Sequence, residues 1–254
     1  MRRLWIFKIP AAAVLIAGLL FGQVKQPKLK SKKEQDAVMA IFNAPDAAGK
    51  IKAVDELLVS FADTEFKAIA LQIAAMSAAE VNDFEKMVIY AERTLEADPH
   101  NYEAMLLLAS GIANRTREFD LDKEEKLGRA EKFADGAIEA IKTAEKPNPN
   151  VTDEQWAAAK KDYTARALEA KGLVSMARKK FDDAIASFKT SIETASSPDP
   201  ATKVRLAAAY NNAGKYDDAI ATIDQLTADP NLHPAIRQFA GQEKMKAVQG
   251  KAKK

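Results

Sequence analysis

The chain of 254 residues has no cysteine, only two histidines and few aromatic side chains (7%). The absence of cysteine excludes disulfides, thiol catalysis, cysteine-based zinc sites and a lipid-modified cysteine anchor. Glycine and proline are scarce, with 10 of each, whereas alanine makes up about a fifth of the chain. Because alanine favours helices and is depleted in strands, this composition predicts packed helices and no sheet.

Neither sign of charge dominates the chain, which has 38 basic and 36 acidic residues. Three of the basic residues lie in the first 22 positions, and without that segment the net charge is −1. A nearly neutral chain has no general attraction for nucleic acid, so we expect no such partner. Lysine-rich runs at residues 25–33 and 244–254 are interpreted as solvated ends, with contact to a membrane surface as the alternative.

Residues 1–22 carry a long apolar stretch, which follows two arginines and ends near Phe21. A positive start, an apolar middle and a small residue before a polar segment are typical of a secretory signal peptide. Leu20 is larger than the usual residue near a cleavage site, so an uncleaved membrane anchor through residues 4–21 stays open. Both interpretations predict an exported protein, either periplasmic or secreted, or anchored to the inner membrane and facing outward.

Helical spacing and helix caps recur along the rest of the chain. Thr152 and Gln155 have the spacing of a capping box, which predicts a helix start there. Asp199 and His233 each precede a proline in the arrangement of an N-cap and the first helical position. Asp122 is expected to cap the helix that follows it.

A repeat relates two segments at a spacing of 35 residues, which aligns Phe181-Asp-Asp-Ala-Ile with Tyr216-Asp-Asp-Ala-Ile. Twelve residues before the alanine of each segment stands a small residue, Gly172 or Ala207. Two helices can approach closely only where such crossing positions are small, so each segment is predicted to be a helix pair.

This pattern resembles the tetratricopeptide repeat (TPR) family. The resemblance implies an all-α fold, a right-handed α-solenoid of antiparallel helix pairs. The units at 165–198 and 200–233 match best, and those at 68–101 and 102–144 are degenerate. The residues that carry the resemblance are Ala75, Phe84 and Pro99; Leu108, Ala109, Leu127 and Ala130; Gly172, Phe181, Ala184 and Phe188; and Leu206, Ala207, Tyr210, Gly214, Tyr216 and Ala219.

The predicted organisation has four parts. These are a signal peptide or membrane anchor at 1–22, a polar linker at 23–33, a TPR-like domain at 34–249 and a basic tail at 250–254. Within the domain, residues 34–62 are expected to form an extra helix pair. Residues 234–249 are expected to form a capping helix, which a solenoid needs to cover its last apolar face.

Motifs for catalysis or cofactor binding are weak. The Gly49-Lys50 pair lacks the first glycine and the hydroxyl residue of a phosphate-binding loop. The acidic run at 120–125 lacks the turn glycine of a calcium loop. His100 and His233 have no sequence-local partners for a metal site or a catalytic triad. We therefore expect a protein that is not an enzyme and that needs no cofactor or metal.

In the TPR family, the first helix of each pair lines a groove that holds a peptide or a partner helix. Some members clamp a terminal carboxylate there, but the corresponding positions here hold Met76, Ser110, Leu173 and Ala208, which do not suit that role. Transferred position by position, the groove residues are Ile69, Gln72, Met76, Glu103, Leu106, Ser110, Arg166, Glu169, Leu173, Met176, Val204, Ala208, Asn211 and Asn212.

The resemblance favours a non-catalytic interaction scaffold of the cell envelope, with a protein or peptide partner in the groove. Two alternatives stay open. One is a structural assembly subunit that acts through its convex face or its ends. The other is an all-helical enzyme with a site built from scattered carboxylates.

Overall fold

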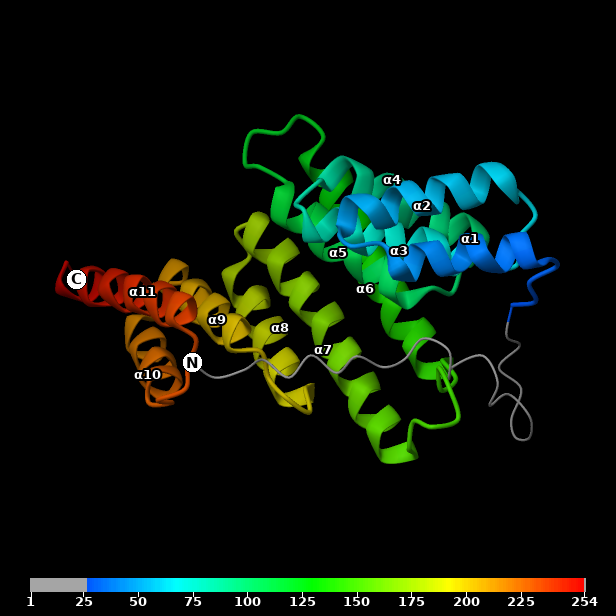
Figure 1. Cartoon of the computed structure of the whole chain (residues 1–254). Coiled ribbons are helices and arrows are strands. Elements are labelled where there is room, and N and C mark those ends of the chain that lie inside the picture. The colour runs from blue at the N-terminus through cyan, green and yellow to red at the C-terminus, as the bar shows by residue number, and fades with distance from the viewer. Residues whose placement is uncertain (1–26, 254) are drawn as a thin grey trace.

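The computed structural model describes residues 27–253, and this part of the chain consists of helices without a strand. The helices stack as antiparallel pairs, with α1 and α2 at one end and α11 at the other (Figure 1). The predicted all-α solenoid is therefore confirmed. The segment expected to be a signal or an anchor lies outside the described residues. The helices are α1 (Lys32–Asn43), α2 (Ala47–Ser60), α3 (Lys67–Glu80), α4 (Phe84–Ala97), α5 (Tyr102–Arg115), α6 (Lys123–Thr143), α7 (Asp153–Ala177), α8 (Phe181–Thr194), α9 (Pro200–Asn212), α10 (Tyr216–Thr227) and α11 (Pro234–Ala252).

The apolar core follows the stack and has no single centre. Its largest cluster joins the buried faces of α1 to α5 and includes Leu127 of α6 and Val174 of α7. A separate cluster joins α9, α10 and α11, where Ala207, Ala219 and Ile223 are fully buried. Each helix pair thus hides its apolar side against its neighbours, as in other solenoids.

The stack is curved because one set of helices packs more closely than the other. Among the odd-numbered helices, α3 packs on α5, α5 on α7, and α9 on α11. No two successive even-numbered helices of residues 27–253 pack to a comparable extent. The odd-numbered helices therefore line the inner, concave face of the curve. The joints between α1 and α3 and between α7 and α9 are exceptions, because these helices do not pack on each other to that extent.

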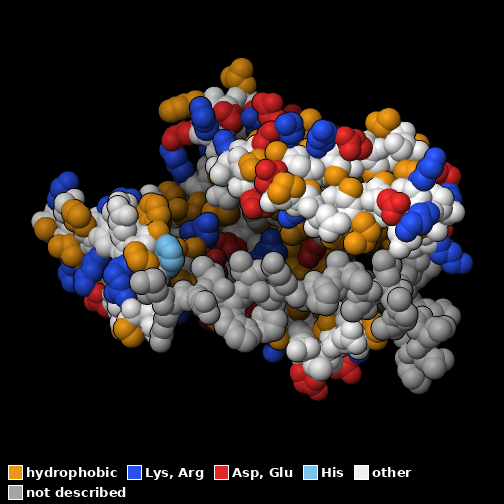
Figure 2. Space-filling model, viewed as in Figure 1, with side chains coloured by type: hydrophobic (Ala, Val, Ile, Leu, Met, Phe, Trp, Pro, Cys, Tyr) orange, Lys and Arg blue, Asp and Glu red, His pale blue; other side chains and the backbone are white. Residues whose placement is uncertain are grey.

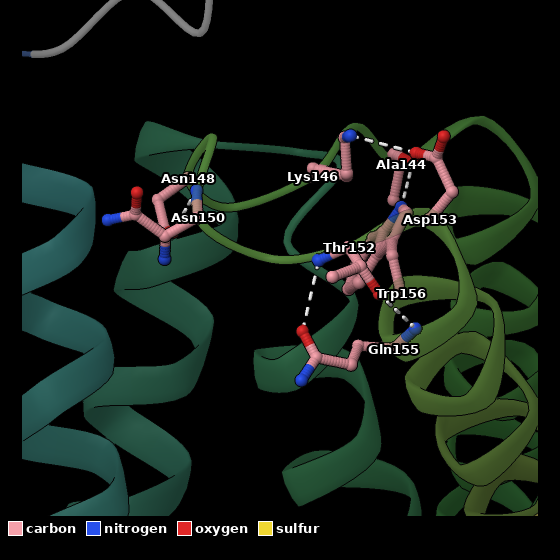
Figure 3. A network of polar contacts seen from close by, with 8 residues as sticks. All are labelled: Ala144, Lys146, Asn148, Asn150, Thr152, Asp153, Gln155 and Trp156. Carbon is pink, nitrogen blue, oxygen red and sulfur yellow. Dashed lines mark hydrogen bonds and ion pairs between the residues drawn. The ribbon is translucent and has the colours of Figure 1, made fainter.

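The start of α7 has the predicted capping box (Figure 3). The Thr152 hydroxyl accepts a hydrogen bond from the backbone N–H of Gln155 at 3.2 Å, and the Gln155 side chain accepts one from the Thr152 N–H at 3.0 Å. The Trp156 indole donates to the carbonyl of Ala144 at 3.2 Å, which ties α7 to the end of α6. As a result, α7 begins well before the predicted repeat unit and is 25 residues long.

The N-terminal boundary differs from the prediction. α1 begins inside the expected linker because the Ser31 side chain accepts a hydrogen bond from the Glu34 N–H at 3.1 Å and caps the helix. Just before the cap, Lys30 pairs with Asp63 at 2.5 Å and Lys28 N–H donates to the Glu65 carboxylate at 3.0 Å. Residues 28–30 are therefore attached to the α2–α3 turn, while Lys28 and Lys30 remain exposed to solvent as expected.

The structure adds two details at the helix ends. α11 continues to Ala252, so the helix includes part of the expected basic tail. Asp122 stands at the N-cap position of α6 but makes no side-chain capping bond. Its carboxylate pairs instead with Lys126 at 2.9 Å.

Candidate functional site

The predicted groove residues all lie on α3, α5, α7 and α9, which are helices of the inner face. On α3, the large apolar side chains of Ile69 and Met76 are 40% and 50% exposed, and they lie two turns apart on the same face of the helix. Figure 2 shows acidic and basic side chains together in the hollow near the middle of the molecule. The exposed part of α3 thus presents apolar side chains, while charged side chains gather in the hollow.

Leu106 is a wrong prediction as a groove residue, because its side chain is completely buried. It packs with Ala137 and Ile141 of α6 and with Ala167 of α7. The close contact between α5 and α7 covers this position, so Leu106 belongs to the core.

Polar side chains join successive odd-numbered helices in a series that we call the inner polar ladder. Its links are Gln72–Glu103 between α3 and α5, Glu103–Tyr163 between α5 and α7, Glu169–Arg205 between α7 and α9, and Asn211–Glu243 between α9 and α11. Each link joins side chains from neighbouring repeats. The ladder therefore connects the joints of the inner face from α3 to α11.

The first two links share one carboxylate. The Gln72 amide donates to one oxygen of Glu103, and the Tyr163 hydroxyl donates to the other at 2.9 Å. Asn101 in turn donates to the Gln72 side-chain carbonyl at 2.9 Å. Both oxygens of Glu103 are thus satisfied within the protein, which leaves Gln72 and Glu103 little capacity to bind a partner directly.

The last link fastens the terminal helix. The Asn211 amide donates to the backbone carbonyl and to the carboxylate of Glu243, both at 2.9 Å. The neighbouring Asn212 is exposed and donates to the carbonyl of Ala208 within its own helix at 2.8 Å. Of the two predicted groove asparagines, Asn211 therefore holds α11 in place and Asn212 faces solvent.

The remaining predicted residues divide between packing and exposure. Leu173 and Met176 are partly buried against the cluster that joins α8 and α9, and Val204 against the cluster of α9 to α11. Ser110 and Ala208 are half-buried, and Arg166 is exposed. The Arg166 guanidinium lies over the Tyr163 ring, 5.9 Å from its centre. Burial, together with the neighbouring Glu103 carboxylate, raises the pKa of Tyr163.

A cavity of about 310 Å³ lies between α7, the end of α8 and the start of α9, where α7 and α9 are not closely packed. Its floor includes Ile192 and Ala195 near the end of α8. The size is at the lower end of the range for ligand pockets, which begins near 300 Å³. Its polar lining residues are Asp162, Arg166, Glu169, Ser191, Ser197, Asp199 and Thr202.

Glu169 is the most buried carboxylate of this cavity, with its side chain only 15% exposed. Burial raises its pKa, while its ion pair with Arg205 acts in the opposite direction. For Asp162, burial also raises the pKa, but hydrogen bonds from Ser196 and Ser197 outweigh it and hold the pKa below its usual value. The cavity therefore contains carboxylates in two different electrostatic states.

Several residues of the cavity and of the inner polar ladder are not among the groove residues that the sequence predicts. Asp162 and Tyr163 precede the predicted repeat unit, yet the helix signal at Thr152 already placed them on the same helix as Arg166. Arg205 follows Glu169 by 36 residues, so an opposite charge at the repeat spacing was a usable signal. Thr202 and Asp199 carried no comparable signal.

Within residues 27–253, no cluster of three acidic or histidine side chains is arranged to hold a metal ion. None of the described helices has the length and apolar character needed to cross a membrane.

Comparison with known proteins supports the fold. Residues 175–242 match the tetratricopeptide repeat family model. A thermophilic TPR protein from Thermus thermophilus is similar in structure, with a TM-score of 0.58 at 14% identity over 83% of this chain and 98% of that one. The chain therefore has a TPR-type fold, with a repeat sequence that matches the family in its C-terminal part.

Two further solved structures are more distantly similar. A tetratricopeptide repeat protein from Parabacteroides merdae has a TM-score of 0.45 at 12% identity, over 88% of this chain and 92% of that one. The assembly chaperone of RpL4 (Acl4) has a TM-score of 0.42 at 12% identity, over 87% and 98%. No curated protein sequence matches the chain.

Proposed function

We propose that this protein is a non-catalytic interaction scaffold of the cell envelope, which binds an extended peptide or a partner helix on its inner face. The observation that carries the proposal is the exposure of Ile69 and Met76 on the inner helix α3. About half of each side chain is in contact with water in the free state, and contact with a partner would remove this apolar surface from water. The adjoining polar ladder gives the surface a fixed shape before binding.

Site-specific photo-crosslinking tests the inner face. A benzophenone amino acid is placed at Met76 or at Arg166, and the chain is irradiated in its own envelope fraction. Val59 on the even-numbered helix α2 is the matched control, because it is apolar and 86% exposed. We expect the same crosslinked partner from both inner positions and none from Val59. Equal crosslinking from Val59 would contradict use of the inner face.

The affinity of a variant with charged residues on α3 gives a quantitative test of the same surface. The double variant Ile69→Asp with Met76→Asp leaves the core intact, since both side chains are exposed. Once a partner is identified, we expect this variant to lose at least tenfold in affinity, while its thermal midpoint stays near that of the original chain.

The envelope location rests on the charge and apolar pattern of residues 1–22. Alkaline phosphatase joined after residue 33 tests it, because that enzyme gains its disulfides and its activity only outside the cytoplasm. We expect activity from the fusion and none when residues 1–22 are removed. Activity independent of that segment would contradict the proposed export.

A second candidate function, assembly through a surface other than the groove, is favoured by the loop between α5 and α6. This loop projects from the solenoid (Figure 1), and its Phe119 and Leu121 side chains are almost completely exposed. Asp120 between them accepts from the Arg117 N–H and pairs with Lys126, both at 3.1 Å, so the loop is held in shape. If Phe119→Ser with Leu121→Ser abolishes partner binding and the α3 double variant does not, the loop is the functional surface.

A further inference from the structure

The side chains that line the cavity between α7 and α9 carry more negative than positive charge. Asp162, Glu169 and Asp199 contribute three carboxylates to its lining, and Arg166 is the one lining residue with a positive charge. Arg205 lies behind Glu169 and pairs with it. With both arginines counted, the site keeps one negative charge in excess.

The carboxylates are held in place by the fold. The Asp162 carboxylate accepts from the backbone N–H and the hydroxyl of Ser196, both at 2.7 Å, and Asp199 accepts from the Ala201 N–H at 2.8 Å. These bonds position the oxygens without neutralising their charge. A cation that enters would therefore be attracted chiefly by the fixed negative charge of these carboxylates, since the Asp162 oxygens already accept from Ser196 and Ser197.

The two arginines do not offset the buried charge completely. Arg166 remains exposed and stacks over Tyr163, and it forms no ion pair with a carboxylate of the described residues. Despite both guanidinium groups, burial still raises the pKa of Glu169. The ionised form of this carboxylate is thus under-stabilised in the free protein, and a further positive charge nearby would stabilise it.

We propose that this cavity is a socket for the positively charged side chain of a lysine or arginine in a peptide that lies along the inner face. This inference rests on the proposed function and names an anchor for the partner. The volume of about 310 Å³ accommodates one long side chain and little more. Its lining residues Arg166 and Glu169 belong to α7, an inner helix, so the socket adjoins the surface that the peptide would follow.

The test uses four capped heptapeptides of alanine and glycine that differ only in the central residue, which is lysine, arginine, norleucine or glutamate. Each is titrated into the isotope-labelled full chain, and the backbone amide signals of Ser197 and Thr202 are followed by NMR. We expect saturable shifts with lysine and arginine and at least tenfold weaker binding of norleucine. Preference for norleucine or glutamate, or no shift with any peptide, would contradict the proposal that the cavity binds a lysine or arginine side chain.

Two variants locate the binding. Glu169→Gln removes one negative charge and is expected to weaken lysine and arginine binding at least tenfold. Ser197→Trp fills the cavity from an exposed lining position, and Glu193→Trp, on an exposed position of α8 outside the lining, is its control. We expect loss of binding with Ser197→Trp only. Equal loss in both tryptophan variants, or full binding in Ser197→Trp, would place the peptide elsewhere.

The socket and the proposed function can fail separately. Crosslinking at Met76 reports whether the inner face holds a partner, and it does not depend on the α7–α9 cavity. A positive crosslink with no charge-selective binding at Thr202 would reject the socket alone.

Discussion

Gly172 of α7 lies directly against the Phe188 ring of α8, so that a Cβ at position 172 would come within 2.5 Å of the ring. Phe188 is completely buried and cannot move aside. We expect Gly172→Ala to destabilise the protein by about 1–3 kcal/mol, because overpacking outweighs the better helix propensity of alanine. Chemical denaturation measures the change.

Gly241 of α11 is the matched control, since a Cβ there would meet nothing within 4 Å. Gly241→Ala is expected to stabilise its helix by up to about 1 kcal/mol. If both glycine variants gain stability, the close crossing of α7 and α8 is not as tight as the structure shows.

Asn211→Asp should loosen the terminal helix. The new carboxylate would face Glu243, and the two hydrogen bonds that the Asn211 amide donates to that residue would be lost. We expect a loss of about 1–3 kcal/mol, seen as faster amide hydrogen exchange across α11. Asn212→Asp adds the same charge in the same helical turn but is exposed, so it should change stability by no more than about 0.5 kcal/mol.

Thr152→Ala removes one half of the capping box at the start of α7. The expected cost is about 1 kcal/mol, since the Gln155 N–H loses its side-chain acceptor. Thr152→Ser keeps the hydroxyl and should restore most of the stability. Urea denaturation of the three proteins gives the comparison, and an alanine variant as stable as the serine variant would mean that the cap is not needed.

The Asp162 carboxylate predicts a pH dependence of stability. Its pKa is lower in the folded protein than in the unfolded chain, where it is near 3.9, because Ser196 and Ser197 donate to the ionised form. Its contribution is therefore complete above about pH 5 and is lost as the pH falls through the folded pKa, below about 4. The difference in thermal midpoint between the original chain and Asp162→Asn should shrink between pH 6 and pH 3, and a constant difference would contradict this assignment.

The solenoid could be predicted because its local signals agree with one another. The repeat at Phe181 and Tyr216, the small residue Gly172 and the cap at Thr152 each have a simple steric or hydrogen-bonding cause. The ends of α1 and α11 were less predictable. The sequence predicts a solvated Lys30. Its ion pair with Asp63 forms because folding brings the α2–α3 turn close to residue 30.

The candidate site was predictable at the level of helices and less so at the level of single residues. The family positions put Ile69, Met76 and Leu106 on inner helices, but only Ile69 and Met76 are exposed there, whereas Leu106 is completely buried. A repeat with uniform spacing would leave position 106 open. The close contact of α5 with the unusually long α7 buries it, and the length of a helix does not reveal which neighbour it covers.

The open joint between α7 and α9 also affects how the molecule responds to force. At this joint the inner helices pack less closely than α5 and α7 or α9 and α11 do, and Glu169–Arg205 is their link in the polar ladder. Tension that straightens the array would therefore bend it first at this position, with α9 to α11 swinging as one block on their own apolar cluster. Elastic compliance concentrated at one place would let the two ends adapt to a curved partner while each block keeps its internal shape.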